Sequence, residues 1–216
     1  MNIVLLGPPA SGKGTCSEYL QQKCNMTHIS MGDLLREYVK SGAEKAQLIS
    51  KVMSEGKILA EDITADLLRD YLKKIDLYDN ILLDGYPRGL KSVEYVNDFL
   101  KIDMVIVLEA SLEEIKNRIL NRLICPDCGK VYSKNDGAET CSDCKIQLIV
   151  RDDDTEAALN TRMAEYERLT VPVIEHYKRL GIAYVIKSDE DMLKQLDVII
   201  NKTNLVIDKT DKANCR

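Results

Sequence analysis

The chain begins with Ile3-Val4-Leu5-Leu6 and then Gly7-Pro8-Pro9-Ala10-Ser11-Gly12-Lys13-Gly14-Thr15. A short apolar run that ends in glycine and proline predicts a buried strand of a parallel sheet. The glycines after it let backbone N–H groups turn toward an anion. A helix beginning at about Lys13 adds its N-terminal partial charge, and the lysine adds a mobile full charge. The spacing G-x4-G-K therefore predicts a phosphate-binding loop. A flexible glycine turn with a surface lysine is the alternative, and the flanking strand and helix argue against it.

The same short apolar runs recur along the chain and predict further strands at 81–83, 104–108 and 182–186. Between them lie stretches with helical character, namely 13–23, 62–74, 112–123, 155–179 and 189–200. Strands that alternate with helices predict an α/β fold, in which helices cover both faces of a parallel sheet. Two segments interrupt this alternation and read as insertions. Residues 31–59 are polar and helical without a strand, and residues 124–150 carry four cysteines.

The composition narrows the class of protein. Among 216 residues, 45% are hydrophobic and 30% are charged, which is typical of a globular chain and excludes a disordered one or a coiled coil. The formal net charge of -5 argues against a protein that binds nucleic acid through an overall positive field. No segment resembles a signal peptide or is apolar enough to cross a membrane. We therefore expect a cytoplasmic protein without a membrane or nucleic-acid partner.

The four cysteines of the second insertion form two C-x2-C pairs separated by twelve residues, Cys125 with Cys128 and Cys141 with Cys144. This is the spacing of a tetrahedral zinc site, and four thiolates leave no open position for catalysis. A loop with so few large apolar side chains needs a metal to fold. The sequence thus predicts a structural Zn2+, although four thiolates also accept iron or cobalt. A redox pair and a nucleic-acid-binding ribbon are the alternatives. The two histidines have no ligand spacing around them and are expected to be structural.

Arginines recur where a phosphate could be held. Arg118 and Arg122 lie four residues apart on one predicted helix, a spacing that repels unless an anion lies between them. Arg151 follows the cysteine-rich insertion, and Arg162 comes three helical turns later. Arginine binds phosphate with two parallel hydrogen bonds, which lysine does not. The alternative is a set of solvated charges paired with glutamates such as Glu114 and Glu165.

Two further motifs adjoin predicted elements. Asp84-Gly85-Tyr86-Pro87-Arg88 follows a buried strand, at the edge of a parallel sheet where ligands bind. There an aspartate can hold Mg2+ through water and an arginine can hold a phosphate. Ser30 and Asp33 read as a capping box for a helix that carries Arg36.

Together these motifs resemble the adenylate kinases, in the long-lid type with a zinc-bearing lid, and more broadly the nucleoside monophosphate kinases. The resemblance is carried by GPPASGKGT at 7–15, GDLLR at 32–36, EGKIL at 55–59, LLDGYPR at 82–88, CPDCGKVY at 125–132 and RDDD at 151–154. It implies a P-loop NTPase fold with a five-stranded parallel sheet. It further implies a core of residues 1–29, 60–121 and 151–216, a helical domain at 30–59 that binds the nucleoside monophosphate (NMP), and a zinc-binding lid at 122–150.

The resemblance also implies an activity: reversible phosphoryl transfer from Mg-ATP to AMP, giving two ADP, by a monomer with a structural Zn2+. Two alternatives stay open. The first is the same fold acting on another acceptor, such as UMP, CMP or GMP. The second is a non-catalytic ATP-binding zinc module.

Residue roles follow from the resemblance position by position. ATP would be bound by Ala10, Ser11, Gly12, Lys13, Gly14, Thr15, Arg118, Arg122, Val131 and Tyr132. AMP would be bound by Met31, Arg36, Lys57, Ile58, Leu59, Gly85, Tyr86, Arg88, Ser92, Arg151 and Arg162. Catalysis would rest on Lys13, Asp84, Arg88, Arg118, Arg122, Arg151 and Arg162, of which Arg118, Arg151 and Arg162 would span the transferred group. Mg2+ would be held through water by Thr15, Asp33 and Asp84.

The chain departs from the family pattern at three positions. Met31 and Gly89 stand where the family usually has threonine, and Ser92 stands where it usually has a glutamine that reads the adenine edge. Serine is too short to reach the base directly, which weakens the expected preference for AMP. Backbone contacts near Lys57, Leu59 and Gly85 could retain it.

Overall fold

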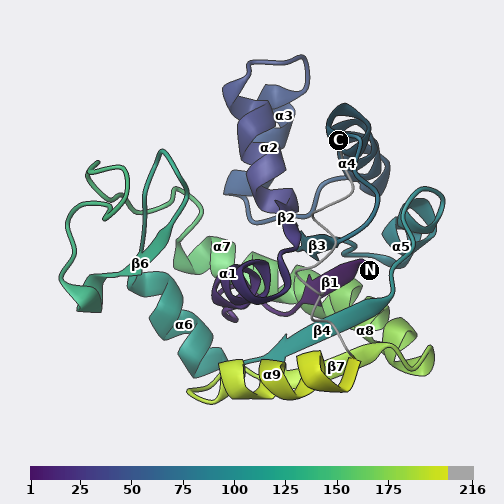
Figure 1. Ribbon diagram of the computed structural model, residues 1–216. Coiled ribbons are helices and arrows are strands. Elements are labelled where there is room, and N and C mark those ends of the chain that lie inside the picture. Colours follow the sequence, from purple (N-terminus) through teal and green to yellow (C-terminus); the bar gives the residue numbers. More distant parts are fainter. Residues whose placement is uncertain (204–216) are drawn as a thin grey trace, which may run out of the picture.

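The computed structural model describes residues 1–203, and its centre is a parallel sheet of five strands in the order β2-β3-β1-β4-β7 (Figure 1). The strands are β1 (Ile3–Leu6), β2 (Thr27–Ser30), β3 (Ile81–Asp84), β4 (Met104–Glu109) and β7 (Ala183–Lys187). The predicted α/β fold and five-stranded sheet are confirmed. Of the core expected from the sequence, residues 204–216 lie outside the described part of the chain.

Strand β2 did not show as an apolar run in the sequence. It lies at the edge of the sheet, and within Thr27–Ser30 only Ile29 is buried. An edge strand needs apolar side chains at fewer positions than a central one, so the pattern of a fully buried strand is missing.

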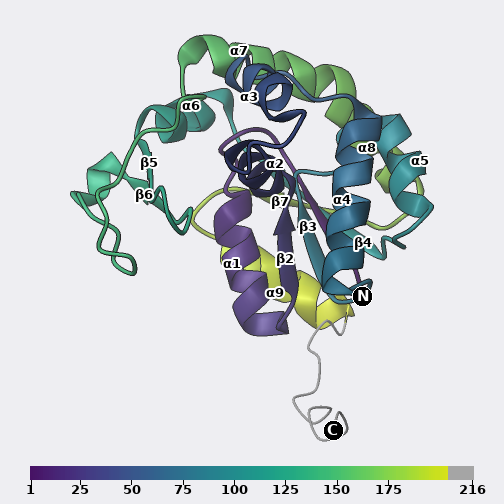
Figure 2. The same ribbon diagram turned by 90° about the horizontal axis from the view of Figure 1, so that it is seen from above.

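Helices cover both faces of the sheet (Figure 2). Helices α1 (Lys13–Cys24) and α9 (Met192–Thr203) pack against one face, and α4 (Glu61–Ile75), α5 (Leu90–Asn97) and α8 (Val171–Arg179) pack against the other. Side chains of a strand alternate between faces, so Ile3 and Leu5 join the first layer while Val4 and Leu6 join the second. Burying each such side chain contributes roughly 1.5–3 kcal/mol. Within residues 1–203, no helix has the length and apolar character needed to cross a membrane.

Two segments project from the sheet at the places where the sequence pattern breaks (Figure 1). Helices α2 (Met31–Lys40) and α3 (Ala46–Ser54) lie between β2 and α4. The hairpin of β5 (Arg122–Ile124) and β6 (Val131–Ser133), followed by the 3-10 turn η1 (Lys134–Asp136), lies between α6 (Leu112–Leu120) and α7 (Glu156–Glu165). The two segments touch where the Lys40 Nζ donates to the Pro126 carbonyl at 3.3 Å.

Two predicted helices differ from the structure. The helix expected to reach residue 123 ends at Leu120, because Arg122–Ile124 pairs with β6 instead. The helix predicted over 155–179 is divided by the π turn η2 (Tyr166–Thr170) into α7 and α8. Pro172, in the first turn of α8, has no N–H to donate, and this wider turn precedes it. The turn directs the Thr170 hydroxyl to the Arg88 carbonyl at 3.2 Å.

Gly56 follows α3 and packs against α7. Replacing Gly56 therefore tests the packing between these two segments. Its φ is +72°, and a Cβ there would lie 2.5 Å from the backbone oxygen of Ala158. We expect Gly56→Ala to lower the free energy of unfolding by about 2–4 kcal/mol, from the left-handed backbone and the clash together. Urea denaturation measures the loss.

Gly42→Ala is the matched control for this variant. Gly42 has a φ of +68° but open space around its Cβ position. Its substitution should therefore cost only the conformational part, about 1–2 kcal/mol. Equal losses in the two variants would contradict a steric role for Gly56.

Candidate functional site

The loop between β1 and α1 has the backbone that the sequence predicts for phosphate binding. Gly7, Ala10 and Gly12 have φ values of +153°, +56° and +87°. A Cβ at Gly7 would lie 2.8 Å from the Leu108 carbonyl oxygen, and one at Gly12 would lie 3.0 Å from the Ser188 Oγ. Glycine is therefore required at both positions. The first turn of α1 has no side-chain cap, so its N–H groups are available to a ligand.

Lys13 lies at the centre of this loop. Its Nζ donates to the carbonyl oxygens of Gly7 at 3.0 Å and Pro8 at 2.8 Å. Loss of hydration in the cleft, together with repulsion from Arg88, Arg162 and Arg122, outweighs the attraction of Asp84 and lowers the pKa of Lys13 to about 8. A bound anion would raise this pKa again, because it attracts the charged amine. The charged form of Lys13 is therefore stabilised by a phosphate close to its amine.

Several arginines converge on the same cleft, namely Arg36, Arg88, Arg122, Arg151 and Arg162. Burial and the neighbouring Arg162 lower the pKa of Arg88 to about 10, and burial with Arg36 and Arg122 lowers the pKa of Arg151 to about 10. The Nε of Arg151 is buried and has no hydrogen-bond partner among residues 1–203. These guanidinium groups repel one another across the cleft. An anion with several negative oxygens would bind several of them at once and remove this repulsion.

Two of the arginines are held by neighbouring carboxylates. The Arg122 guanidinium donates to both oxygens of Asp154, with an Nε–Oδ2 distance of 2.7 Å. The Arg162 Nη1 donates to Asp153 at 3.1 Å. The Asp154 side chain is fully buried, which makes its pair with Arg122 sensitive to the loss of either partner. These carboxylates fix where the guanidinium groups point.

The glutamates considered as alternative partners bind elsewhere. Glu114 accepts from the N–H and hydroxyl of Ser111 at the start of α6, and Glu165 accepts from Arg168. The arginines of the cleft are therefore not surface charges neutralised by those two residues.

Arg118 differs from the other arginines. Its Nη1 donates to the Ser188 Oγ at 2.7 Å and to the Ala10 carbonyl at 3.3 Å, while its Nη2 donates to the Ser188 carbonyl at 2.7 Å. These contacts tie it to the phosphate loop rather than to the other guanidinium groups. The expectation that it spans a transferred group stays a prediction.

Asp84 lies at the carboxyl end of β3, with its Oδ2 3.7 Å from the Nε2 of His28. Asp84 Oδ1 and His28 Nε2 are both buried without a hydrogen-bond partner in the described structure. They face the cleft together with Thr15 and Asp33. Burial alone would raise the pKa of Asp33, but Arg36 outweighs it, so the net pKa is lowered. These oxygens suit a hydrated divalent cation.

His28 is a site residue that sequence reasoning missed, since it was expected to be structural. The signal lies in strand β2, whose register places His28 beside Leu82 and Ser30 beside Asp84. Ser30 caps α2 through the Asp33 N–H, at 3.3 Å, as expected. The Asp33 carboxylate, however, accepts from Arg36 instead of completing a capping box.

The cleft has a larger and a smaller compartment. The larger one is lined by every residue expected for ATP, for Mg2+ and for catalysis, from the phosphate loop to Val131 and Tyr132. The smaller one is lined by the residues expected for AMP apart from Arg151, and additionally by Gly32, Leu35, Met53, Gly56, Thr64 and Asp153. Arg36, Arg88 and Arg162 line both. The two compartments therefore meet at arginines.

The three departures from the family pattern lie in or beside the smaller compartment. Met31 and Ser92 line it and are almost fully buried. Gly89 has an ordinary extended backbone, with φ -137°, so it is not needed for conformation. A Cβ there would lie 2.0 Å from the Oε1 of Glu61. The Glu61 carboxylate fills the space that a larger residue at position 89 would need.

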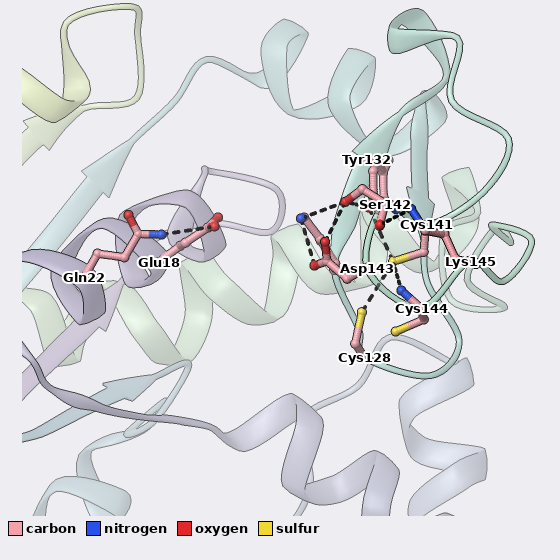
Figure 3. Close-up of polar contacts among 10 residues, drawn as sticks. Glu18, Gln22, Cys128, Tyr132, Cys141, Ser142, Asp143, Cys144 and Lys145 are labelled. Atoms are coloured by element: carbon pink, nitrogen blue, oxygen red, sulfur yellow. Dashed lines mark hydrogen bonds and ion pairs between the residues drawn. The ribbon is translucent and has the colours of Figure 1, made fainter.

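The four cysteines of the second insertion come together, and Figure 3 shows three of them, Cys128, Cys141 and Cys144. Their sulfur atoms all lie within 4.8 Å of one another, and Cys128 and Cys141 are 3.7 Å apart. Four sulfurs around zinc at about 2.3 Å are separated by about 3.8 Å, so the cluster is compatible with zinc. The N–H of Cys144 and the hydroxyl of Tyr132 lower the pKa of the Cys141 thiol to about 6, which favours the thiolate. Convergence of four sulfurs on one point supports a metal rather than a redox pair.

Comparison with known proteins agrees with this geometry. A family model described as adenylate kinase matches residues 5–182. An adenylate kinase of Kosmotoga olearia is 37% identical over 203 residues, covering 89% of this chain and 94% of the relative. One from Petrotoga mobilis is 35% identical and covers 94% of this chain and 99% of its own length. One from Chlamydia pneumoniae is 34% identical and covers 89% and 95%.

Proposed function

The chain belongs to the adenylate kinase family, and from this premise we propose where the reaction of that family takes place in it. The reaction is the reversible transfer of the terminal phosphoryl group of Mg-ATP to AMP, which gives two ADP. One observation carries the assignment: the larger and smaller compartments meet at Arg88 and Arg162, whose charges act on Lys13.

ATP occupies the larger compartment. The N–H groups of the phosphate loop and Lys13 bind its phosphates, and Arg118, Arg122, Val131 and Tyr132 surround the rest of the nucleotide. The left-handed backbone of Gly12 and the uncapped start of α1 support this placement.

AMP occupies the smaller compartment, where Arg36 and Arg88 bind its phosphate. Its base lies among the buried side chains of Met31, Leu59 and Ser92. Lys57, Ile58, Gly85 and Tyr86 complete the wall. The AMP phosphate then faces the arginines that both compartments share.

Transfer needs little chemistry from the protein. An AMP phosphate oxygen attacks the terminal phosphorus of ATP in line, the bond to the ADP oxygen breaks, and no covalent intermediate forms on the chain. The loose transition state spreads negative charge over the moving group, and Lys13, Arg88, Arg151 and Arg162 stabilise that charge from fixed positions. The carboxylates of Asp153 and Asp154 keep Arg162 and Arg122 oriented during the transfer.

Two metals complete the proposal. Thr15, Asp33 and Asp84 would hold, through water, a Mg2+ ion that enters with ATP, and such an ion would neutralise phosphate charge. The unpartnered Oδ1 of Asp84 supports that role. Zn2+ would be bound by Cys125, Cys128, Cys141 and Cys144, and it would hold the second insertion in shape.

The two insertions act as covers. Residues 30–59 form the NMP-binding domain, residues 122–150 form the lid, and the remaining chain is the core. Closing over the cleft excludes water, which would otherwise hydrolyse ATP. The contact between Lys40 and Pro126 supports an approach of the covers to one another. We propose that the protein acts as a monomer, as the resemblance to the family implies.

A coupled assay of ADP formation tests the proposed function. With ATP as donor, we expect AMP to be a faster acceptor than UMP, CMP or GMP, and a zinc chelator to lower the rate. A faster rate with another monophosphate would reassign the acceptor. ATP binding without ADP formation from any acceptor would indicate a non-catalytic zinc module.

A further inference from the structure

Ser188 lies at a junction of three elements beside the phosphate loop. It follows β7, and its N–H donates to the Glu109 carbonyl at the end of β4 at 2.8 Å. Its side chain is almost fully buried. The sheet thus fixes the backbone of Ser188 at the edge where the cleft opens.

The hydroxyl and the carbonyl of Ser188 bind two different nitrogens of one guanidinium. The Arg118 Nη1 donates to Ser188 Oγ and the Nη2 donates to Ser188 O, each at 2.7 Å. The Nη1 also donates to the Ala10 carbonyl at 3.3 Å. Because two nitrogens are bound to the same residue, the guanidinium does not rotate without losing one of these bonds. Ser188 therefore sets its orientation.

This pair of residues lies directly against the phosphate loop. A Cβ at Gly12 would come within 3.0 Å of Ser188 Oγ and 3.8 Å of Arg118 Nη1. Ser188 and Arg118 line the larger compartment, and neither lines the smaller one. The hydrogen bond from Arg118 to the Ala10 carbonyl also ties it to the phosphate loop. Its influence is therefore directed to one nucleotide.

We propose that Ser188 is a positioning residue for the donor nucleotide: it holds the Arg118 guanidinium against the phosphate loop, so that ATP meets a cation of fixed orientation. The proposal rests on the assignment of the larger compartment to ATP. A hydroxyl that accepts from a charged donor stabilises it more than an ordinary hydrogen bond does. Removing the hydroxyl leaves the Arg118 guanidinium held only by the carbonyl oxygens of Ser188 and Ala10, so its orientation is less fixed, and the AMP compartment is untouched.

The first experiment compares Ser188→Ala and Ser188→Thr with the unmodified protein, with each substrate varied in turn. In Ser188→Ala we expect the KM for ATP to rise about tenfold, while the KM for AMP changes less than about twofold. Ser188→Thr keeps the hydroxyl and should retain most of the affinity for ATP. An unchanged KM for ATP in Ser188→Ala would overturn the proposal, and so would an equal rise for both substrates.

A double-mutant cycle separates positioning from a structural role. In the Arg118→Ala background, Ser188→Ala should leave the KM for ATP unchanged, because the residue through which it acts is gone. An equal rise in both backgrounds would show that Ser188 acts independently of Arg118 and would overturn the proposal.

Ser111→Ala is the matched control, because Ser111 caps α6, the helix that carries Arg118. The Ser111 hydroxyl caps α6 by accepting from the Glu114 N–H at 3.2 Å. Its loss should lower the melting temperature without raising the KM for ATP.

ATP binding measured by calorimetry keeps the test of Ser188 distinct from the test of the proposed function. Failure of the unmodified protein to form ADP would overturn the function alone, and equal ATP affinities of the unmodified and Ser188→Ala proteins would overturn the role of Ser188.

Discussion

Lys13→Met is expected to lower kcat by about a thousandfold while the protein stays folded. Methionine preserves the length and apolar stem of the side chain but removes the charge that lies among the carbonyl groups of the phosphate loop. Phosphoryl transfer depends on such fixed charge more than on proton transfer. Steady-state assays give the rate, and thermal unfolding confirms that the fold is intact.

Lys23→Met is the control for this variant. Lys23 lies on the same helix, α1, but pairs with Asp197 at the surface. Its loss should leave kcat unchanged. A Lys13→Met protein with near-normal turnover would refute the role assigned to the phosphate loop.

The lowered pKa of Lys13 predicts how the activity depends on pH. The pKa of about 8 in the free protein means that the amine carries its charge below pH 8 and loses it above. We therefore expect kcat/KM for ATP to fall as the pH rises through about 8, a step that Lys13→Met lacks. The value of kcat should fall at a higher pH, because bound phosphate restores the charge of the amine.

Replacing Cys128 and Cys144 by serine is expected to abolish metal binding and unfold the lid locally. These two ligands are the less buried of the four, so their replacement disturbs packing little. Structural zinc contributes about 10–16 kcal/mol in small domains, whereas the buried apolar cluster of this segment is limited to Cys125, Cys141 and Leu148. Metal analysis, the melting profile and kcat should all change together.

Ser142→Ala serves as the control for the lid. It removes a hydroxyl that contacts Tyr132 in the same loop but leaves the four thiols in place. It should retain the metal. An unchanged melting profile in the double serine variant, with no metal bound to the original protein, would contradict the zinc proposal.

Local sequence patterns predicted the parts of this protein that local chemistry determines. The glycines of residues 7 and 12 are required by backbone angles and close contacts, and the cysteine spacing matches the ligand spacing of a tetrahedral ion. Both leave a signature within a few residues. The central strands were equally visible, because burial on both faces demands an unbroken apolar run.

Other features depend on contacts between distant segments. Strand β2 is recognisable only once the sheet has an edge, and α6 ends early because β6 pairs with the residues that follow it. His28 reaches Asp84 through strand pairing, and Arg118 reaches Ser188 across 70 residues of sequence. No periodicity or short motif carries this information.

Asp153 and Asp154 have a consequence for which anions compete for the cleft. By pairing with Arg162 and Arg122, they weaken the attraction of those two guanidinium groups for a stray sulfate or inorganic phosphate. A lone ion gains too little to displace an internal counter-ion that is already in place. A ligand that extends through both compartments touches many cations at once and competes successfully. Two acidic side chains thus weaken the competition of small anions with the nucleotides.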